Sequence, residues 1–226
     1  VFQRRAVEML ISSKVREAFD LSLEPLGVRE RFGMHGWGQR AILARRLVER
    51  GVPWVTVVME SPSQSGIPML KAGTYNWDSH AVNCHLFDDA RVRLPIYDRV
   101  ITAMVEDLYE RGLDKRVLLV VTGEFGRTPR LRTQVGSRTK VNQPGRDHWP
   151  RGSCALLAGG GMKHGQVIGA TDRLGGEASE RPVHFMEVLA TLYHHVGIDT
   201  DTATLPDLTG RPHYITDGHK PIHELI

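Results

Sequence analysis

Three short polar segments of this 226-residue sequence carry the side chains that divalent metals prefer. They are Trp77-Asp78-Ser79-His80, Gly123-Glu124-Phe125-Gly126-Arg127 and Arg146-Asp147-His148-Trp149. Each segment has a carboxylate and two also have a histidine, and such groups from separate loops form the usual ligand sets of divalent metals. Arg127 and Arg146 lie beside them in the sequence, and a guanidinium can grip a phosphate or sulfate through parallel hydrogen bonds. Metal ligands next to arginines predict hydrolysis of an anionic ester.

Each segment also has a structural interpretation. Asp78 could cap the helix that follows it, with His80 as a surface residue. Glu124 could be a loop carboxylate that pairs with Arg127, and Asp147 could orient the neighbouring arginine. Against this, extended backbone places alternate residues on one side, so Asp78 and His80 could reach the same metal. All three segments lie in loops at the ends of predicted strands, and this shared position favours one site.

The composition is typical of a soluble globular protein and argues against a nucleic-acid-binding surface. Apolar residues make up 41% and charged residues 24% of the chain, and the formal net charge is +3. No face carries a continuous stripe of lysine and arginine. The densest basic stretch runs from Arg127 to Lys140. We interpret this stretch as a solvated loop, and its alternative role is to attract an anionic substrate.

Membrane and redox features give few constraints. Cys84 and Cys154 lie in segments with buried character, so we expect free thiols that act as small apolar groups. No apolar run reaches the ~20 residues that a membrane span needs, and no secretory signal peptide is recognisable. The sequence begins with Val1 rather than Met, so we expect any export signal to lie upstream of Val1. Cellular location and oligomeric state stay open.

Hydrophobic periodicity predicts helices that alternate with short apolar strands. The predicted helices are 3–20, 25–31, 36–50, 82–111 and 182–196, and the predicted strands are 52–59, 117–122, 153–158 and 166–169. This alternation indicates a mostly parallel sheet covered on both faces, in a single domain over residues 1–226. Glu124 would then follow the carboxyl end of strand 117–122, where ligands bind in open α/β sheets. The loop 126–151 is long enough to be functional or disordered.

The sequence resembles the DUF1501 family, a sulfatase-like group placed with the alkaline phosphatase superfamily. The resemblance rests on the three polar segments and on Arg45–Val52, Leu157–Gly161, Gly165–Gly169 and Glu180–Val183. It covers nearly the whole chain, which looks like the C-terminal part of a family member. The resemblance implies a three-layer α/β/α sandwich and hydrolysis or transfer at sulfate and phosphate esters, commonly on two metals.

The resemblance also implies individual roles. Asp78 and His80 look like the loop that gives an Asp and a His to one metal. Glu124 stands where relatives have a strand-end acid, and His148, with Asp147, looks like a later histidine ligand. The implied metal is zinc, manganese or calcium, and the implied substrate is a sulfated or phosphorylated ester.

The sequence departs from the family pattern at several places. The first pair is spaced D-x-H where relatives have D-x-x-x-H, and Glu124-Phe125 replaces an Asp-His pair. We expect the first metal-binding Asp and the Ser, Thr or Cys nucleophile of relatives to lie before Val1. An upstream segment could complete the site, the site could use one metal, or it could have lost its activity.

Three functions therefore stay open. The first is a metal-dependent ester hydrolase in which Arg127 binds the substrate's oxyanion as a catalytic residue. The second is a catalytically silent protein of the same fold that holds an anionic glycan on the basic loop 127–140. The third is a structural metal site at His80 and His148, which would be closed, with no open coordination position.

Overall fold

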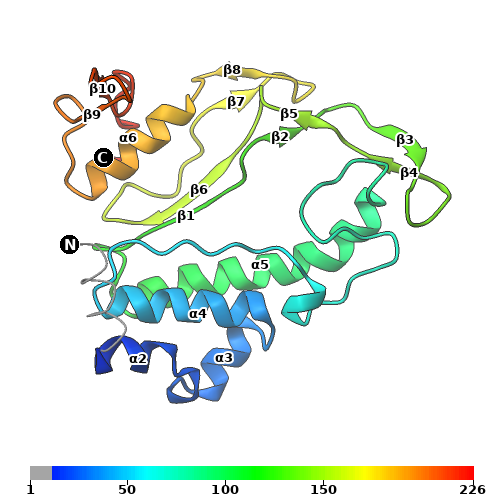
Figure 1. Ribbon diagram of the computed structural model, residues 1–226, viewed down its shortest axis with the longest axis horizontal. Coiled ribbons are helices and arrows are strands. Elements are labelled where there is room, and N and C mark those ends of the chain that lie inside the picture. The colour runs from blue at the N-terminus through cyan, green and yellow to red at the C-terminus, as the bar shows by residue number, and fades with distance from the viewer. Residues whose placement is uncertain (1–11) are drawn as a thin grey trace. The chain divides into compact units, whose positions relative to one another are not determined.

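A computed structural model describes residues 12–226 (Figure 1). The chain divides into two compact units. The first unit comprises the residues up to Asp107 together with Arg130–Asp147, and the second comprises Leu108–Pro129 and His148–Ile226. Compact units within one chain need not fold independently. The expectation of a single domain over residues 1–226 therefore stays a prediction.

The first unit contains most of the helices. They are α2 (Ser13–Phe19), α3 (Leu26–Phe32), α4 (Gly36–Glu49) and α5 (Leu86–Glu110), with the short 3-10 helices η1 (Leu21–Leu23) and η2 (Ser63–Ser65) between them (Figure 1). The predicted helices 25–31, 36–50 and 82–111 are confirmed. Part of the predicted helix 3–20 corresponds to α2, and residues 3–11 lie outside the described residues.

The apolar faces of these helices meet in one core. Phe32, Trp37, Ile42 and Val100 are fully buried there, and they come from α3, α4 and α5. Burying side chains of this size stabilises each helix by about 1.5–3 kcal/mol per residue, far more than helix propensity alone. The core therefore holds α5 against α3 and α4 around Val100.

A buried network of ion pairs joins the helices beside this core. Glu24 is only 6% exposed, and its Oε2 accepts a hydrogen bond from Arg46 Nη1 at 2.7 Å. Arg45, also buried, contacts Glu24 through a terminal guanidinium nitrogen. Asp107 on α5 is 2% exposed and pairs with Arg31 at 3.2 Å. Removing one partner would leave a charge buried without compensation, which is strongly unfavourable.

The apolar segment 52–59 is extended but pairs with no strand among the described residues, so the predicted strand is wrong. The carbonyl groups at its end accept hydrogen bonds from side chains instead of from a neighbouring strand. Val58 O accepts from Arg40, Met59 O from Trp77, and Glu60 O from Trp37. Side-chain donors thus satisfy backbone groups that a sheet would otherwise have used.

The strands of the structure pair two by two. In the first unit, β3 (Arg132–Val135) pairs with β4 (Asn142–Gly145). In the second unit, β1 (Leu118–Thr122) pairs with β6 (Ala155–Gly159), and β2 (Gly126–Arg127) pairs with β5 (His148–Trp149). The remaining pairs of the second unit are β7 (Ala170–Thr171) with β8 (Ala178–Glu180) and β9 (Thr204–Pro206) with β10 (Pro212–Tyr214). Helix α6 (Phe185–His195) belongs to the second unit and confirms the predicted helix 182–196. The predicted strands 117–122 and 153–158 correspond to β1 and β6.

The prediction of a three-layer α/β/α sandwich with a mostly parallel sheet is wrong. Every sheet among the described residues is antiparallel and two-stranded. Parallel neighbours need a crossover connection, usually a helix, whereas antiparallel neighbours need only a chain reversal. Residues 123–154 connect β1 to β6 with short strands and no helix, so the chain reverses between them. The loop predicted at 126–151 holds β2 to β5, and 166–169 is not a strand.

No helix in residues 12–226 is both long and apolar enough to cross a membrane. Neither cysteine of residues 12–226 forms a disulfide, as predicted. Cys84 is buried, but Cys154 is exposed directly before β6, so the prediction that it is buried is wrong.

Candidate metal centre

Trp77 anchors the segment that carries Asp78 and His80. Its Nε1 donates a hydrogen bond to Met59 O at 2.6 Å. Its ring centroid lies 5.6 Å from that of Trp37 in the core and 5.7 Å from that of Tyr97. The guanidinium of Arg93 lies over the same indole, 4.4 Å from the ring centroid. Aromatic and cation–π contacts of this kind fix the ring, so the following residue starts from a defined position.

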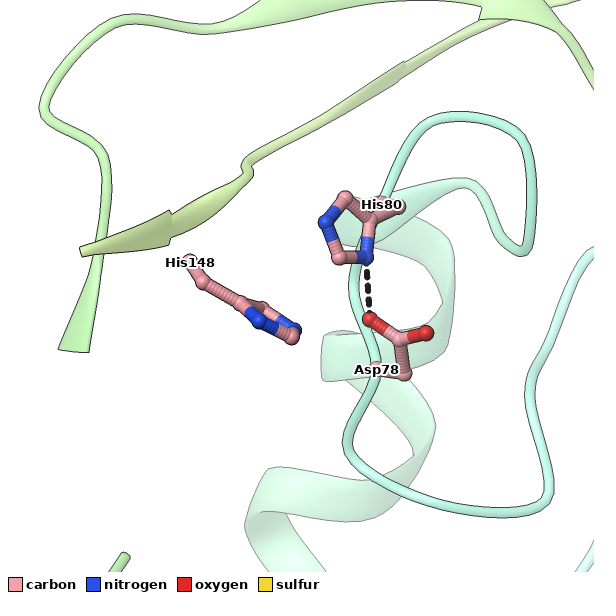
Figure 2. Close-up of side chains that lie close together, drawn as sticks. All are labelled: Asp78, His80 and His148. Carbon is pink, nitrogen blue, oxygen red and sulfur yellow. Dashed lines mark hydrogen bonds and ion pairs between the residues drawn. The ribbon is translucent and has the colours of Figure 1, made fainter. Parts of the chain in front are cut away.

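A tight turn gathers the polar groups of this segment. The carbonyl oxygen of His80 accepts hydrogen bonds from Asn83 N at 2.9 Å and from Cys84 N at 3.1 Å. Asp78 Oδ1 is hydrogen-bonded to His80 Nδ1 (Figure 2), and Asp78 Oδ2 accepts from Asn83 Nδ2 at 2.6 Å. The alternative role of Asp78 as a helix cap is wrong, because α5 begins only at Leu86. Its carboxylate instead binds the imidazole two residues along.

The end of strand β4 lies against the same segment. Arg146 N donates to Ser79 O at 2.9 Å, and buried Gln143 donates through Nε2 to Ala81 O at 2.8 Å. The two backbones approach so closely at Gly145 that a Cβ there would lie 2.1 Å from Ala81 N. Only glycine permits this approach. Residues 143–146 are therefore held against residues 79–81 within the first unit.

Asp147 is the next residue after Arg146, and its carboxylate faces His80. Its Oδ1 lies 3.8 Å from His80 Nε2, and its Oδ2 lies 2.8 Å from Arg132 Nε on β3. The side chains of His80 and Asp147 are 26% and 30% exposed. Both are thus accessible to a small ligand and also partly shielded from water. Arg132 compensates part of the negative charge of Asp147.

His148 is the next residue along the chain and the first of β5. Successive Cα atoms are about 3.8 Å apart, so the Cα of His148 lies within about 7.6 Å of that of Arg146, whose N–H is bonded to Ser79. One ligand atom each of Asp78, His80 and His148 lies within 4.8 Å of the others, and Figure 2 shows the three side chains together. One carboxylate and two imidazoles suit a divalent ion such as zinc or manganese.

Within the second unit, His148 lies beside an arginine and an aromatic ring. Arg127 on β2 is directly opposite His148 in the antiparallel register. Directly opposed residues of an antiparallel pair project from the same face. The ring of Phe125 lies 4.3 Å from the imidazole of His148. A group that can bind an anion therefore shares a face with a group that can bind a metal.

Glu124 is placed differently from the other predicted ligands. It lies in the bend between β1 and β2, and it is exposed. No group of three or more ligand side chains in residues 12–226 includes it. The structure brings together Asp78, His80 and His148, and it places Asp147 opposite His80. A metal-binding role for Glu124 stays a prediction.

Several residues of the centre were missed at the sequence level. Asn83, Gln143 and Gly145 bind or approach the Asp78–His80 segment but carry no metal-ligand signature of their own. Asn83 had a weak local signal, since asparagine favours turns and it lies three residues after His80. Gln143 and Gly145 act across a long sequence separation, which no local pattern reveals.

The geometry defines the chain as a protein with a candidate divalent-metal centre. The chain belongs to the family described as "Protein of unknown function (DUF1501)", which it matches over residues 2–226. The predicted family is therefore confirmed. No curated protein and no solved structure matches the chain.

Proposed function

We propose that this protein is a metal-dependent hydrolase of sulfate or phosphate esters. The observation that supports it most is the group formed by Asp78, His80 and His148, with Arg127 opposite His148 in the strand register. A divalent metal bound there supplies Lewis-acid polarisation of an ester oxygen. Every other contribution comes from side chains of the chain itself.

The residues fit such a metal by their chemistry. Asp78, His80, Asp147 and His148 offer oxygen and imidazole nitrogen donors, the set that zinc and manganese take. Asp78 and His80 are about one-quarter to one-third exposed, at 30% and 26%. A four-coordinate metal held by Asp78, His80 and His148 keeps a fourth position for a ligand. This openness favours a catalytic centre over a closed structural site.

Arg127 is the residue we assign to substrate binding. It is half-buried on β2, so its guanidinium is partly desolvated. Guanidinium binds oxyanions through two parallel hydrogen bonds. An ester oxyanion held by Arg127 would lie next to His148. Sulfate and phosphate monoesters are both tetrahedral oxyanions, so this grip accepts either.

The likeness of the motifs to sulfatase-like proteins of the alkaline phosphatase superfamily supports the choice of ester. It is a likeness of short segments such as Gly123–Thr128 and Arg146–Pro150, and not of the fold described above. Function depends on the site more than on the fold, so the proposed ester hydrolysis can be tested although the predicted sandwich fold is wrong.

The alternative function, a catalytically silent protein that binds an anionic glycan through loop 127–140, receives less support. Arg132 in that loop pairs with Asp147, and Arg138 donates to Gly73 O at 2.9 Å. Both arginines therefore have internal partners. A surface that binds a glycan by charge alone would leave its cations directed at solvent.

The test is turnover of an aryl sulfate and an aryl phosphate by protein loaded with zinc, manganese or calcium. We expect His148→Ala to lose metal and turnover while its circular dichroism spectrum stays unchanged. We expect Arg127→Lys to keep the metal and to raise KM, because an ammonium cannot make the bidentate contact. Arg173→Ala, at an exposed arginine, is the matched control and should behave as wild type.

Two results would contradict the proposal. Wild-type protein that binds no metal in any of the three salts would remove its basis. Stoichiometric metal with no turnover of either ester, but with saturable binding of a sulfated glycan, would favour the silent binding protein instead.

A further inference from the structure

We propose that Asn83 is a positioning residue of the metal centre, which fixes His80 so that Nε2 is its metal-binding atom. The inference rests on the proposed function, because Asn83 would hold a residue of the same metal site in place. All groups that carry it lie between Asp78 and Asp147 within the first unit.

The turn after His80 brings Asn83 back to Asp78. The carbonyl oxygen of His80 accepts from both Asn83 N and Cys84 N, which closes the turn. The side chain of Asn83 is half-buried, and its Nδ2 donates to Asp78 Oδ2 at 2.6 Å. A hydrogen bond to an ionised acceptor is stronger than one between neutral groups. Asn83 therefore restricts rotation of the Asp78 carboxylate.

The second oxygen of that carboxylate decides which nitrogen of His80 carries hydrogen. Asp78 Oδ1 is bonded to His80 Nδ1. An ionised carboxylate only accepts hydrogen bonds, so Nδ1 must be the donor. In a neutral imidazole the other nitrogen then carries the lone pair. The hydrogen bond from Asn83 thus fixes Asp78. Asp78 in turn keeps the hydrogen of His80 on Nδ1 and leaves Nε2 unprotonated.

The surroundings of Nε2 are those of a metal ligand. This nitrogen faces Asp147 Oδ1 at a distance of 3.8 Å. That distance exceeds a hydrogen bond. A lone pair and a carboxylate oxygen that face each other repel, and a cation between them would convert the repulsion into attraction. Histidines that bind metals generally donate their other N–H to a carboxylate or carbonyl, as His80 donates to Asp78.

The roles of the two carboxylates follow from this geometry. Asp78 accepts one hydrogen bond on each oxygen, from Asn83 and from His80, and each oxygen keeps a lone pair that can contact the metal. Asp147 faces His80 Nε2 and adds negative charge beside the metal. Asn83 touches neither metal nor substrate, and its role is to hold Asp78.

Two measurements on the full chain test this assignment. The first is two-bond 15N–1H NMR of His80 in metal-free protein at about pH 8, where an unperturbed imidazole is neutral. The second is zinc affinity by competition with a chromophoric chelator. The variants are Asn83→Ala and Asn83→Leu, which keeps a similar shape without a donor. Asn142→Ala, at an exposed asparagine of β4, is the matched control.

We expect wild type and Asn142→Ala to carry hydrogen on Nδ1 of His80 and to bind zinc equally. We expect both Asn83 variants to show a mixture of tautomers and to bind zinc about 10- to 100-fold more weakly. The inference would be overturned if both Asn83 variants kept the wild-type tautomer and bound zinc within about twofold of wild type. Such a change is much smaller than the loss expected when a residue that holds a metal ligand is removed. Wild-type protein without zinc binding would instead overturn the proposed function, and the NMR result would still decide whether Asn83 positions His80.

Discussion

The Asp78 segment in the first unit and the Glu124 segment in the second unit are similar polar motifs, but the protein holds them differently. Asp78 follows an anchored tryptophan, and both of its carboxylate oxygens accept hydrogen bonds. Glu124 follows the end of β1 and lies exposed in a bend. A carboxylate in a polar motif is thus a strong candidate ligand only where the surrounding side chains fix it.

Individual ion pairs of the two units show a similar contrast. The first unit buries ion pairs such as Glu24 with Arg46 beside its helical core. The second unit places its best-defined cluster, Arg181 with Glu187 and Glu224, nearer the surface. Buried pairs are costly to break, whereas exposed pairs contribute little to stability. The two units should therefore respond differently to equivalent substitutions.

The largest expected effect comes from a matched pair of glutamate substitutions. Glu24→Ala should lower the free energy of unfolding by about 3–5 kcal/mol, because it leaves Arg45 and Arg46 buried without their shared partner. Glu124→Ala should change it by less than about 0.5 kcal/mol, as is usual for an exposed residue. Urea unfolding followed by circular dichroism measures both. Equal effects of the two substitutions would remove the contrast between the units.

Two glycines provide the next test. Gly145→Ala should destabilise by about 1–3 kcal/mol, because the new Cβ would lie 2.1 Å from Ala81 N and force the two loops apart. Gly123→Ala should be nearly neutral, since its Cβ would have only Phe125 O nearby, at 4.0 Å. Thermal unfolding of both variants decides this. A Gly145→Ala protein as stable as Gly123→Ala would show that the loops are not in close contact.

The smallest effect concerns acid titration of the second unit. Hydrogen bonds from Arg181 lower the pKa of Glu224 to about 2, with Nε–Oε1 at 2.6 Å. A pKa below the ordinary value of 4.5 means that the paired carboxylate stabilises the fold above about pH 4.5. That contribution declines as the pH falls toward 2. Arg181→Ala should raise the pKa of Glu224 toward 4.5 and remove this part of the acid dependence.

Carboxyl NMR titration of the wild type and Arg181→Ala measures this shift. Asp199 provides an internal control, because its pKa is lowered chiefly by the hydrogen bond from Asp201 N, which the substitution does not touch. A Glu224 pKa that stays at about 2 without Arg181 would show that another group is responsible.

Local periodicity predicted most of the elements, but not how the strands pair. Helices α4, α5 and α6 have apolar residues at helical spacing, and a single core-facing stripe is enough to identify them. Strand pairing depends on partners far away in the sequence. Segment 52–59 shows the difference, because its apolar pattern is typical of a buried strand while tryptophan and arginine side chains take its last carbonyls.

The candidate site was predictable to a similar degree. The D-x-H spacing indicated that Asp78 and His80 lie on one side of an extended segment, and the structure places them in contact. The same motif did not indicate Asn83, whose contribution depends on a turn. It also did not indicate Gly145, which matters only because β4 approaches from a distant part of the sequence. Motifs identify candidate ligands, whereas their supports arise from tertiary structure.

The most direct test of a metal centre on the Asp78 segment is zinc titration of wild type, His80→Ala and Glu124→Ala by isothermal calorimetry. We expect stoichiometric binding to wild type and to Glu124→Ala, and an affinity reduced by about 100-fold or more in His80→Ala, because a direct ligand should matter at least as much as its supports. Circular dichroism of each variant verifies folding. Equal affinity of wild type and His80→Ala, or no zinc binding by wild type, would contradict the account.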